Sequence, residues 1–261
     1  MSRTDILVGF FDSGLGGLCI LDAFRRTCPG VSTVYLADSS HCPYGNRPPA
    51  EIVELALANT RRLVGLGCGM IVVACNTATA AAIDTLRKTF PDIPFVGLEP
   101  AIKPAALHSK SGVVGVLATA GTFNGRLYRE TSARVAKNVT VLATVADEFV
   151  TLVENCPRLA TAATDGDANA ENCADCPRST RCRETVRRRI EPLLNAGADH
   201  LVLGCTHFPH LKPLIEEVAA GRATAVDPSE AVAQQAKRLL AQITRRQTAT
   251  DAPIQHRFIR T

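Results

Sequence analysis

Hydrophobic and polar residues alternate along this chain in blocks that predict parallel α/β architecture. Short apolar runs with strand character recur at intervals, and stretches with apolar residues at helical spacing lie between most of them. Alternation of this kind is typical of parallel sheets, because parallel strands need a crossover connection, which is usually a helix. The predicted strands are residues 7–11, 33–37, 70–74, 95–98, 113–117, 139–143, 201–204 and 223–226.

Helical spacing is clearest in four segments. The first predicted helix opens with the glycines of residues 14–17, carries Leu18, Leu21 and Phe24 on one face, and stops at the Cys-Pro-Gly of residues 28–30. The other three are residues 50–66, 79–90 and 229–242, and the last of them begins with a serine followed by a carboxylate, as at a helix N-cap. We expect the residues after this helix to form a frayed tail.

Two of the predicted strands end in the same way, which indicates an internal repeat. One leads into Cys75-Asn76-Thr77 and the other into Gly204-Cys205-Thr206-His207, and in each case a glycine lies eight residues before the cysteine. Each half of the chain also opens with an apolar run that ends in small polar residues, namely residues 8–13 and 114–119. Two similar halves facing each other would place two thiols on opposite walls of one cleft.

Polar side chains cluster just after five of the predicted strands. Ligands of open α/β sheets bind outside the carboxyl ends of the strands, so these positions are the candidate site. They are Asp12 and Ser13, Asp38 with the loop around Tyr44, residues 75–77, residues 119–122, and residues 205–207.

Composition describes an ordinary globular protein and excludes some functions. Of the 261 residues, 46% are hydrophobic and 21% are charged, and the net charge is +4. Only 5% are aromatic and tryptophan is absent, which argues against a base-stacking nucleic-acid surface. The basic excess is concentrated in a run for which we expect a solvated helix face rather than a polyanion site: Arg178, Arg181, Arg183, Arg187, Arg188 and Arg189.

No targeting segment is visible in the sequence. The first apolar run, residues 6–11, is too short for a secretory signal and is followed by Asp12, and no apolar stretch approaches the ~18 residues of a membrane span. We therefore expect a cytoplasmic protein that does not cross a membrane. In that reducing compartment the ten cysteines indicate catalysis or metal binding rather than disulfides.

The two strand-end cysteines suit proton transfer. A free thiol has a pKa of ~8.5, and the positive end of a following helix would favour the thiolate further. One such cysteine would suffice for a hydrolase, whereas two in equivalent positions suggest that a proton is removed from one face of a carbon and returned to the other. The alternative for a single cysteine, a buried small hydrophobe, does not account for the repetition.

The remaining polar groups suit a small zwitterion. Ser13, Asn76, Thr77, Thr119, Thr122 and Thr206, with nearby backbone amides, can hold carboxylates. Asp12 can meet an ammonium group or, alternatively, can cap the following helix. His207 can handle a proton or be structural. The glycines of residues 14–17 lack the spacing of a dinucleotide-binding loop and the lysine of a P-loop, so we expect no nucleotide site.

With these motifs in view, the chain resembles the glutamate racemases of the cofactor-independent aspartate/glutamate racemase superfamily. The motifs that carry the resemblance are residues 12–17 (Asp-Ser-Gly-Leu-Gly-Gly), Asp38 with residues 43–45 (Pro-Tyr-Gly), residues 74–78, residues 97–100 and residues 204–207. The resemblance implies two pseudo-symmetric α/β domains, each a mostly parallel sheet flanked by helices, with the active site between them. We place the discontinuous first domain at residues 1–98 plus 208–261, and the second at residues 99–207.

The resemblance also implies the roles of individual residues. Cys75 and Cys205 would be the two acid/base residues, and Asp12, Glu154 and His207 would assist them. We add Thr119 and Thr122, which the resemblance does not specify, as further assisting residues. The substrate would be bound by Asp12, Ser13, Tyr44, Gly45, Asn76, Thr77, Thr206 and His207. The reaction would interconvert L- and D-glutamate without a catalytic cofactor and supply D-glutamate for peptidoglycan synthesis, and the protein would be a homodimer.

A cysteine-rich insertion departs from the pattern of the family. Cys156 follows Glu154, and Cys173, Cys176 and Cys182 come after a polar loop, so the insertion covers about residues 156–182. Four thiols at this spacing could hold structural zinc or an iron–sulfur cluster, or they could be surface thiols or an oxidisable pair.

Two other functions compete with racemisation. A hydrolase would use Cys205 as nucleophile and His207 as base, and it would leave Cys75 without a role. A metal- or redox-sensing protein would retain only a vestigial cleft. The presence of both strand-end cysteines favours the racemase over either alternative.

Overall fold

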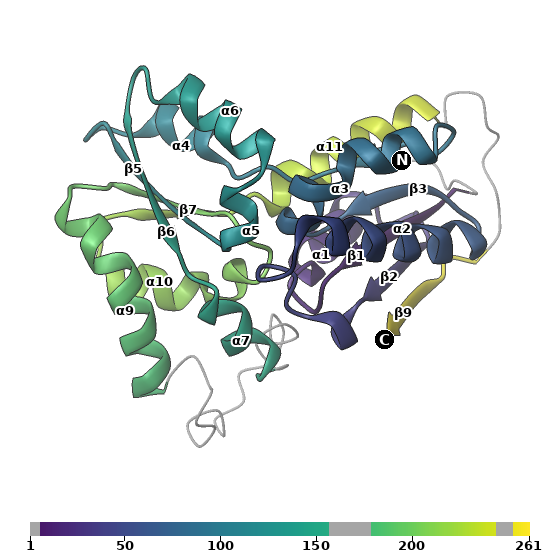
Figure 1. Ribbon diagram of the computed structural model, residues 1–261, viewed down its shortest axis with the longest axis horizontal. Helices are drawn as coiled ribbons and strands as arrows, with labels where there is room; N and C mark the ends of the chain where they lie inside the picture. Colours follow the sequence, from purple (N-terminus) through teal and green to yellow (C-terminus); the bar gives the residue numbers. More distant parts are fainter. Residues whose placement is uncertain (1–5, 157–178, 244–252) are drawn as a thin grey trace. The chain divides into compact units, whose positions relative to one another are not determined.

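The computed structural model describes residues 6–156, 179–243 and 253–261. The chain divides into two compact units, the first made of residues 1–98 and 229–261 and the second of residues 99–228. Each unit is built on its own parallel sheet with helices packed against it (Figure 1). The predicted α/β class is confirmed.

The sheet of the first unit has five parallel strands in the order β4-β3-β1-β2-β9. Their bounds are β1 (Leu7–Asp12), β2 (Thr33–Ala37), β3 (Cys68–Val73), β4 (Phe95–Val96) and β9 (His256–Arg260). β1 lies at the centre, where Phe10 is in register with Tyr35 of β2 and with Val72 of β3. All five residues of β2 are buried, as expected for a parallel strand that is covered on both faces.

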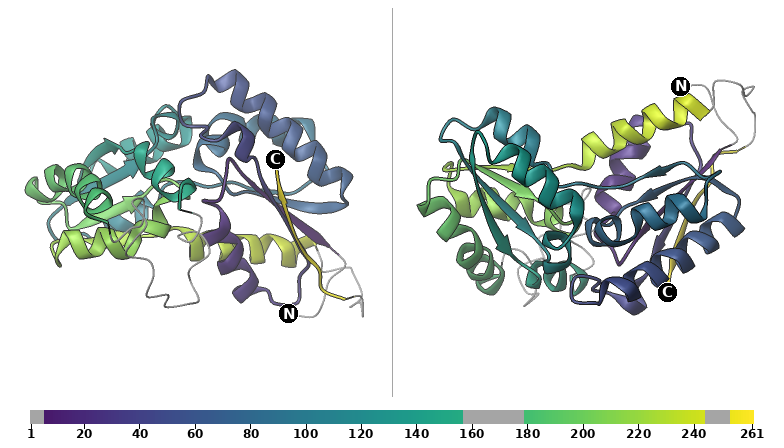
Figure 2. Two further views of the ribbon diagram at one scale, coloured as in Figure 1. Left: turned by 90° about the horizontal axis from the view of Figure 1, so that it is seen from below. Right: turned by 45° about the horizontal axis from the view of Figure 1, so that its top comes forward.

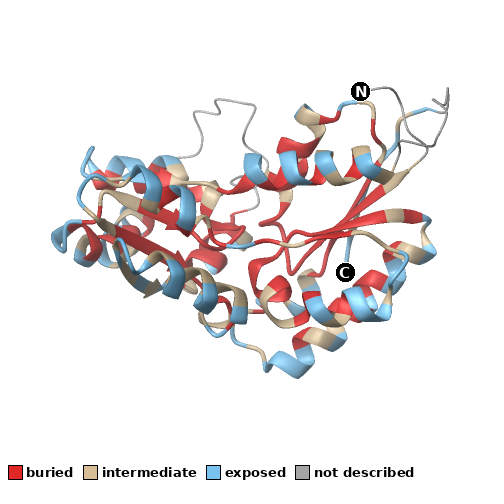
Figure 3. Ribbon diagram, turned by 90° about the horizontal axis from the view of Figure 1, so that it is seen from above, coloured by how far each residue is buried: buried red, intermediate tan, exposed pale blue. Residues whose placement is uncertain are grey.

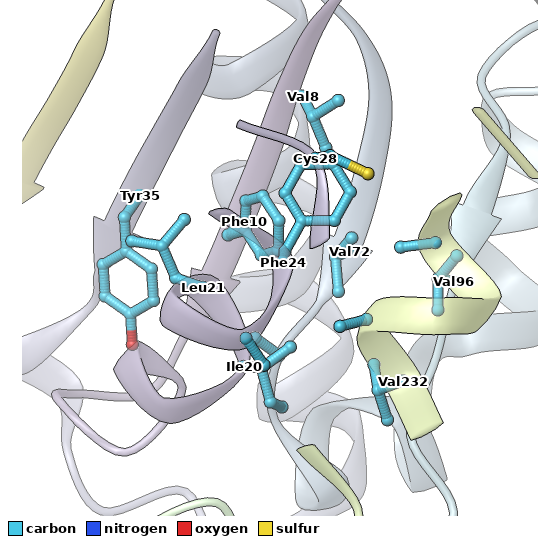
Figure 4. Packing of buried hydrophobic residues seen from close by; sticks show 14 of the residues in the cluster. Val8, Phe10, Ile20, Leu21, Phe24, Cys28, Tyr35, Val72, Val96 and Val232 are labelled. Atoms are coloured by element: carbon cyan, nitrogen blue, oxygen red, sulfur yellow. The ribbon is translucent and has the colours of Figure 1, made fainter. Parts of the chain in front are cut away.

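Two pairs of helices cover the two faces of this sheet (Figure 2). The bounds are α1 (Leu18–Thr27) and α11 (Ser229–Ile243) on one face, α2 (Pro49–Gly65) and α3 (Asn76–Thr89) on the other, and the short helix η1 (Ser39–His41) after β2. On the first face, Phe10 packs against Phe24 of α1 with a ring-centroid distance of 5.3 Å, and Val232 of α11 belongs to the same core (Figure 4). Burial of these side chains fixes α1 and α11 against the sheet.

The second unit has a four-stranded parallel sheet in the order β6-β5-β7-β8. Its strands are β5 (Val113–Ala118), β6 (Thr140–Val145), β7 (His200–Leu203) and β8 (Thr224–Val226). Its helices are α4 (Ile102–His108), α5 (Ala120–Phe123), α6 (Arg126–Val135), α7 (Glu148–Glu154), α9 (Thr180–Asn195), η3 (Phe208–Leu211) and α10 (Lys212–Ala219). The two inner strands, β5 and its neighbour β7, are almost fully buried (Figure 3).

The two units share one strand order, in agreement with the predicted repeat. In the first sheet, β3 and then β4 follow β1 on one side and β2 lies on the other. In the second sheet, β7 and then β8 follow β5 on one side and β6 lies on the other. The helices that precede β3 and β7 are followed by Gly67 and Gly197, whose φ angles are 88° and 87°. Both glycines turn the chain back toward the sheet in the left-handed region, which other residues rarely adopt.

The structure differs from two expectations about the end of the chain. Residues 208–228 pack with the second unit rather than the first, because β8 extends the β7 edge of the second sheet and α10 packs on α9. The segment that we expected to be a frayed tail contains β9, which pairs with β2 through five residues. Part of that tail, residues 244–252, lies outside the described residues.

The arginine run forms an exposed face of α9. Arg181, Arg187 and Arg188 are exposed, while Arg183 and Arg189 form ion pairs with Glu217 and Glu148. This is the solvated helix face that the sequence predicts. Arg178 lies outside the described residues. Among the helices in the described part of the chain, none combines the length and the apolar character needed to cross a membrane.

A close contact at the start of α1 gives a test of the first unit. A Cβ atom added to Gly17 would lie 2.8 Å from both the Cβ and the carbonyl oxygen of Ala74. Since backbone cannot yield easily, we expect Gly17→Ala to lower the free energy of unfolding by about 1–3 kcal/mol. Gly65→Ala is the matched control, because a Cβ atom added there would meet no other atom within 4 Å. Equal urea midpoints for the two variants would contradict this packing.

Candidate acid–base site at the strand ends

The candidate residues of the first unit converge at the carboxyl ends of β1 and β3. The backbone N–H of Ala74 donates to the carbonyl of Phe11 at 2.8 Å, so the next residues, Cys75 and Asp12, lie side by side at the end of the sheet. The side chains at these ends are all buried, with exposures of 0 to 4%: Asp12, Ser13, Cys75, Asn76 and Thr77. The sheet therefore gathers a thiol, a carboxylate, an amide and two hydroxyls in one place.

Asp12 organises the loop that leads into α1. Its Oδ2 accepts hydrogen bonds from the backbone N–H groups of Gly14, at 3.3 Å, and Gly17, at 3.1 Å. From the other side, the hydroxyl of Tyr35 donates to the carbonyl of Gly14 at 2.9 Å. These bonds agree with the capping role that the sequence leaves open for Asp12, and they hold the loop in a defined shape.

Cys75 is the N-cap residue of α3. Its sulfur accepts a hydrogen bond from the backbone N–H of Ala78 at 3.4 Å, and the hydroxyl oxygen of Ser13 lies 3.9 Å away. A sulfur in this position faces the positive end of the α3 dipole, which stabilises negative charge. The local structure thus supports a thiolate at Cys75.

Asn76 carries an unusual side chain for a folded protein. It is 2% exposed, and within the described structure neither its amide nitrogen nor its amide oxygen has a hydrogen-bond partner. A buried amide left unpaired costs roughly 1–3 kcal/mol, so such a group indicates that a polar ligand binds there. Asn76 directly follows Cys75, which places that ligand beside the thiol.

Asp38 is a buried carboxylate at the centre of the hydrogen-bond network that holds Tyr44. One carboxylate oxygen accepts from the Tyr44 hydroxyl at 2.5 Å and from Asn59 Nδ2 at 3.3 Å. The other accepts from Thr261 Oγ1 at 2.9 Å and lies 2.8 Å from His41 Nδ1. Burial raises the pKa of Asp38, but the hydrogen bonds from these four residues outweigh it and hold the pKa below its usual value.

The same network determines the protonation and the hydrogen bonds of the Tyr44 hydroxyl. Burial, together with the neighbouring Asp38 carboxylate, raises the pKa of Tyr44 far above its usual value, so the hydroxyl stays protonated. That proton is donated to Asp38, and the hydroxyl oxygen accepts from Asn59 at 3.1 Å. The Tyr44 side chain therefore anchors the loop that contains Gly45.

In the second unit, Cys205 lies next to a histidine and a carboxylate. Its sulfur is 3.7 Å from Nδ1 of His207, and Nε2 of His207 is 2.7 Å from Oε1 of Glu154. Cys205 and His207 are 6% and 1% exposed, and Glu154 ends α7. Phe149 and Phe208, which pack edge to face at 5.1 Å, hold α7 against η3. A carboxylate that orients a histidine beside a thiol is an arrangement suited to proton transfer.

The other candidates of the second unit lie at neighbouring strand ends. Thr119 and Thr122, after β5, are buried and their hydroxyls are 3.0 Å apart. Thr206, which stands between Cys205 and His207 in the sequence, is also buried. Cys205 differs from our expectation in one respect, because a turn and the short helix η3 follow it rather than the N-terminus of an α-helix.

The insertion cysteines are only partly described. Cys173 and Cys176 lie outside the described residues. Cys156 follows the end of α7, Cys182 lies in the first turn of α9, and both are buried. A metal site that uses these four thiols stays a prediction.

Sequence reasoning did not find Asn59 and Thr261. Each donates to Asp38 from a distant part of the chain, Asn59 from α2 and Thr261 from the residue after β9. A buried asparagine on the apolar face of α2 was the available signal for Asn59. For Thr261 the sequence offers no comparable signal, because its contact depends on the pairing of β9 with β2.

Together, the fold and these strand ends define an α/β protein with buried thiols at equivalent positions of two similar units, equipped for acid–base chemistry. The family model of Asp/Glu/Hydantoin racemases matches residues 19–236. A glutamate racemase of Pseudomonas syringae pv. tomato is 43% identical over 236 residues, which cover 90% of this chain and 79% of that relative.

Solved structures agree with the sequence comparison. Escherichia coli glutamate racemase in complex with L-glutamate and the activator UDP-MurNAc-ala superposes with a TM-score of 0.76 at 32% identity, over 95% of this chain and 85% of that one. A glutamate racemase isoform from Bacillus anthracis gives a TM-score of 0.77 at 27% identity, over 99% and 90% of the two chains. The chain belongs to the Asp/Glu/Hydantoin racemase family, and its resemblance to the glutamate racemases is confirmed.

The hydrogen-bonded carboxylate of Asp38 gives a stability prediction with a defined pH dependence. Asp38→Asn keeps the size of the side chain but removes its charge, so we expect a loss of about 1–3 kcal/mol at pH 7. Because the folded-state pKa lies below the unfolded value of ~3.9, the stabilisation is complete above that pH and disappears as pH falls through the folded-state pKa.

The measurement is urea unfolding of wild type and variant at pH 7 and in steps below pH ~4. The difference between the two proteins should shrink as the pH falls. Asp92→Asn, at an exposed position, is the control and should change little at any pH. A difference that stays constant into the acid range would show that the charge of Asp38 is not what stabilises the network.

Proposed function

We propose that this protein interconverts L- and D-glutamate, with Cys75 and Cys205 as the two acid–base residues. The observation that carries the proposal is the equivalence of the two thiols. Each follows the strand that lies next to the central strand of its own sheet, and each is buried among polar side chains. Inversion at a carbon needs a base on one face and an acid on the other, and two thiols can exchange these roles in the reverse reaction.

In the proposed mechanism one cysteine, as thiolate, removes the α-proton of glutamate and becomes a thiol. The other cysteine, as thiol, delivers its proton to the opposite face of the α-carbon and becomes a thiolate. The mechanism requires both sulfurs to reach one α-carbon. It needs no cofactor, in keeping with a cofactor-independent family, because the transferred protons are carried by the two thiols alone.

The surrounding groups have separate tasks in this proposal. Asn76, whose buried amide has no partner in the described structure, binds a substrate carboxylate together with Ser13, Thr77 and Thr206. Fixed donors of this kind stabilise the carbanion that develops at the α-carbon, and single donors can contribute about 3–4 kcal/mol. Asp12 fixes the loop before α1 and faces the substrate ammonium group.

His207 and Glu154 serve the second thiol. The Glu154 carboxylate fixes the ring of His207, whose Nδ1 faces Cys205. A histidine held in this way can stabilise the thiolate or return a proton to it between turnovers. Thr119 and Thr122 lie at the same end of the second sheet, and we assign their hydroxyls as further hydrogen-bond donors to the substrate.

The Cys205–His207–Glu154 arrangement also supports a second candidate, a cysteine hydrolase. A nucleophile, a base and a carboxylate that orients the base are the parts such an enzyme needs. That function gives no role to Cys75 or to the unpaired amide of Asn76. A homodimer, a cytoplasmic location and a structural metal in the insertion remain predictions.

Isotope exchange distinguishes racemisation from every alternative. The purified protein is incubated with L-glutamate in deuterated water, without pyridoxal phosphate, and chirality and α-deuterium are followed together. We expect D-glutamate to appear carrying deuterium and the mixture to approach equal amounts of the two enantiomers. Deuterium that enters with retention of chirality would mean that one thiol alone acts as a base, and no change in either would contradict the assigned substrate.

Replacement of single cysteines tests the equivalence of the two thiols. We expect Cys75→Ser and Cys205→Ser each to slow racemisation by about a hundredfold or more, because a serine hydroxyl is a far weaker acid–base group. Cys68→Ser is the matched control, since Cys68 is buried at the other end of the strand that leads to Cys75. Full racemase activity in Cys75→Ser would contradict the proposal that the two thiols are equivalent acid–base residues.

A further inference from the structure

We infer that β9 is a positioning element of the active site, which acts through Thr261 on the Tyr44 loop and through Phe258 on the loop before α1. The inference rests on the proposed function, because it takes both loops to bind the substrate. It adds a role for residues at the end of the described chain, far in sequence from every motif of the site.

The pairing of β9 with β2 delivers Thr261 to the site. The strands are parallel and in register from Thr33 with His256 to Ala37 with Arg260. The backbone N–H of Thr261 continues the ladder by donating to the carbonyl of Ala37 at 3.0 Å. Asp38 is the next residue after Ala37, so the ladder sets Thr261 beside the Asp38 carboxylate.

The Thr261 hydroxyl is fully used in this position. It donates its proton to Oδ1 of Asp38 at 2.9 Å and accepts from the backbone N–H of Ser40 at 3.3 Å. The hydroxyl of Ser40 is 2.9 Å away, and the guanidinium of Arg260 donates to the hydroxyl of Ser39 at 2.9 Å. β9 therefore holds the whole turn that connects Asp38 to the Tyr44 loop.

Asp38 links Thr261 to Tyr44, because its two carboxylate oxygens bond to different partners. While Oδ1 faces Thr261 and His41, Oδ2 is directed at the Tyr44 hydroxyl. A carboxylate fixed at one oxygen presents the other in a defined direction, and hydrogen bonds to a charged acceptor are stronger than neutral ones. Loss of the Thr261 donor would leave Oδ1 with His41 alone and would loosen the anchor of the Tyr44 loop.

A second contact of β9 reaches the other loop. The ring of Phe258 stacks on that of Tyr35, with a centroid distance of 5.6 Å and an angle of 6° between the planes. Tyr35 donates to the carbonyl of Gly14, and Gly14 donates to Asp12. This stacking also explains why a large apolar side chain that is 53% exposed stands on this strand.

Thr261→Val tests the inference, with Thr261→Ser as its matched control. Valine keeps the shape and removes the hydroxyl, whereas serine keeps the hydroxyl. We expect the valine variant to raise the KM for glutamate about three- to tenfold with a smaller change in kcat, the range for the loss of one ordinary hydrogen bond. The serine variant should remain close to wild type. Phe258→Ala, compared with Phe258→Tyr, applies the same test to the second contact.

Amide hydrogen exchange of residues 39–47, measured on the same variants, needs no activity. We expect faster exchange in Thr261→Val than in wild type or Thr261→Ser, with unchanged thermal unfolding. Equal KM values and equal exchange in the valine and serine variants would overturn the inference. A wild-type protein without racemase activity would overturn the proposed function instead, and the exchange data alone would then decide whether Thr261 positions the loop.

Discussion

One backbone contact, made once in each unit, is the constraint on which the positions of the two strand-end cysteines depend. The N–H of Ala74 donates to the carbonyl of Phe11 at 2.8 Å, and the N–H of Gly204 donates to the carbonyl of Leu117 at 2.7 Å. Each bond closes the ladder between the central strand and its neighbour, one residue before the cysteine. Parallel pairing fixes this register. Within its own sheet, each cysteine is therefore the first residue after the last ladder bond to the central strand.

The two thiols, although equivalent in the repeat, are supported by different physical means. Cys75 uses the backbone, since its sulfur caps α3 and accepts from Ala78. Cys205 uses side chains, since His207 lies beside it and is held in turn by Glu154. A fixed dipole favours a thiolate whatever the state of the substrate, whereas a histidine can also gain and lose a proton. The repeat thus keeps the position of the sulfur and varies its electrostatic support.

The features that could be predicted from the sequence are those that depend on a local pattern of residues. Eight strands, the repeat and the polar strand ends follow from apolar runs with small polar residues after them, and these lie where expected. β9 was missed because His256, Arg257 and Arg260 carry no apolar alternation, and its pairing depends on β2, more than 200 positions earlier. Asn59 and Thr261 were missed for the same reason: their partner, Asp38, is a neighbour only after the sheet has formed. The boundary near residue 207 was placed too early because β8 is short and its sheet cannot be read from its sequence.

A comparison of the two sheets explains why β9 is needed in one of them. The ladder bond from Asp38 to Asp12 in the first sheet, at 2.9 Å, has its equivalent in the bond from Ala146 to Ala118 in the second, at 3.0 Å. Two buried aspartates in the first unit thus correspond to two alanines in the second. Buried carboxylates must be fully hydrogen-bonded, because an unpaired buried charge is costly. Asp12 finds its donors in the loop before α1. Asp38 has two partners in the segment that follows it, His41 and Tyr44, and two from distant parts of the chain, Asn59 and Thr261. The fifth strand, β9, therefore accompanies Asp38, whose carboxylate it helps to hydrogen-bond. The second unit has an alanine, Ala146, at the equivalent position, and its sheet has no fifth strand among the described residues.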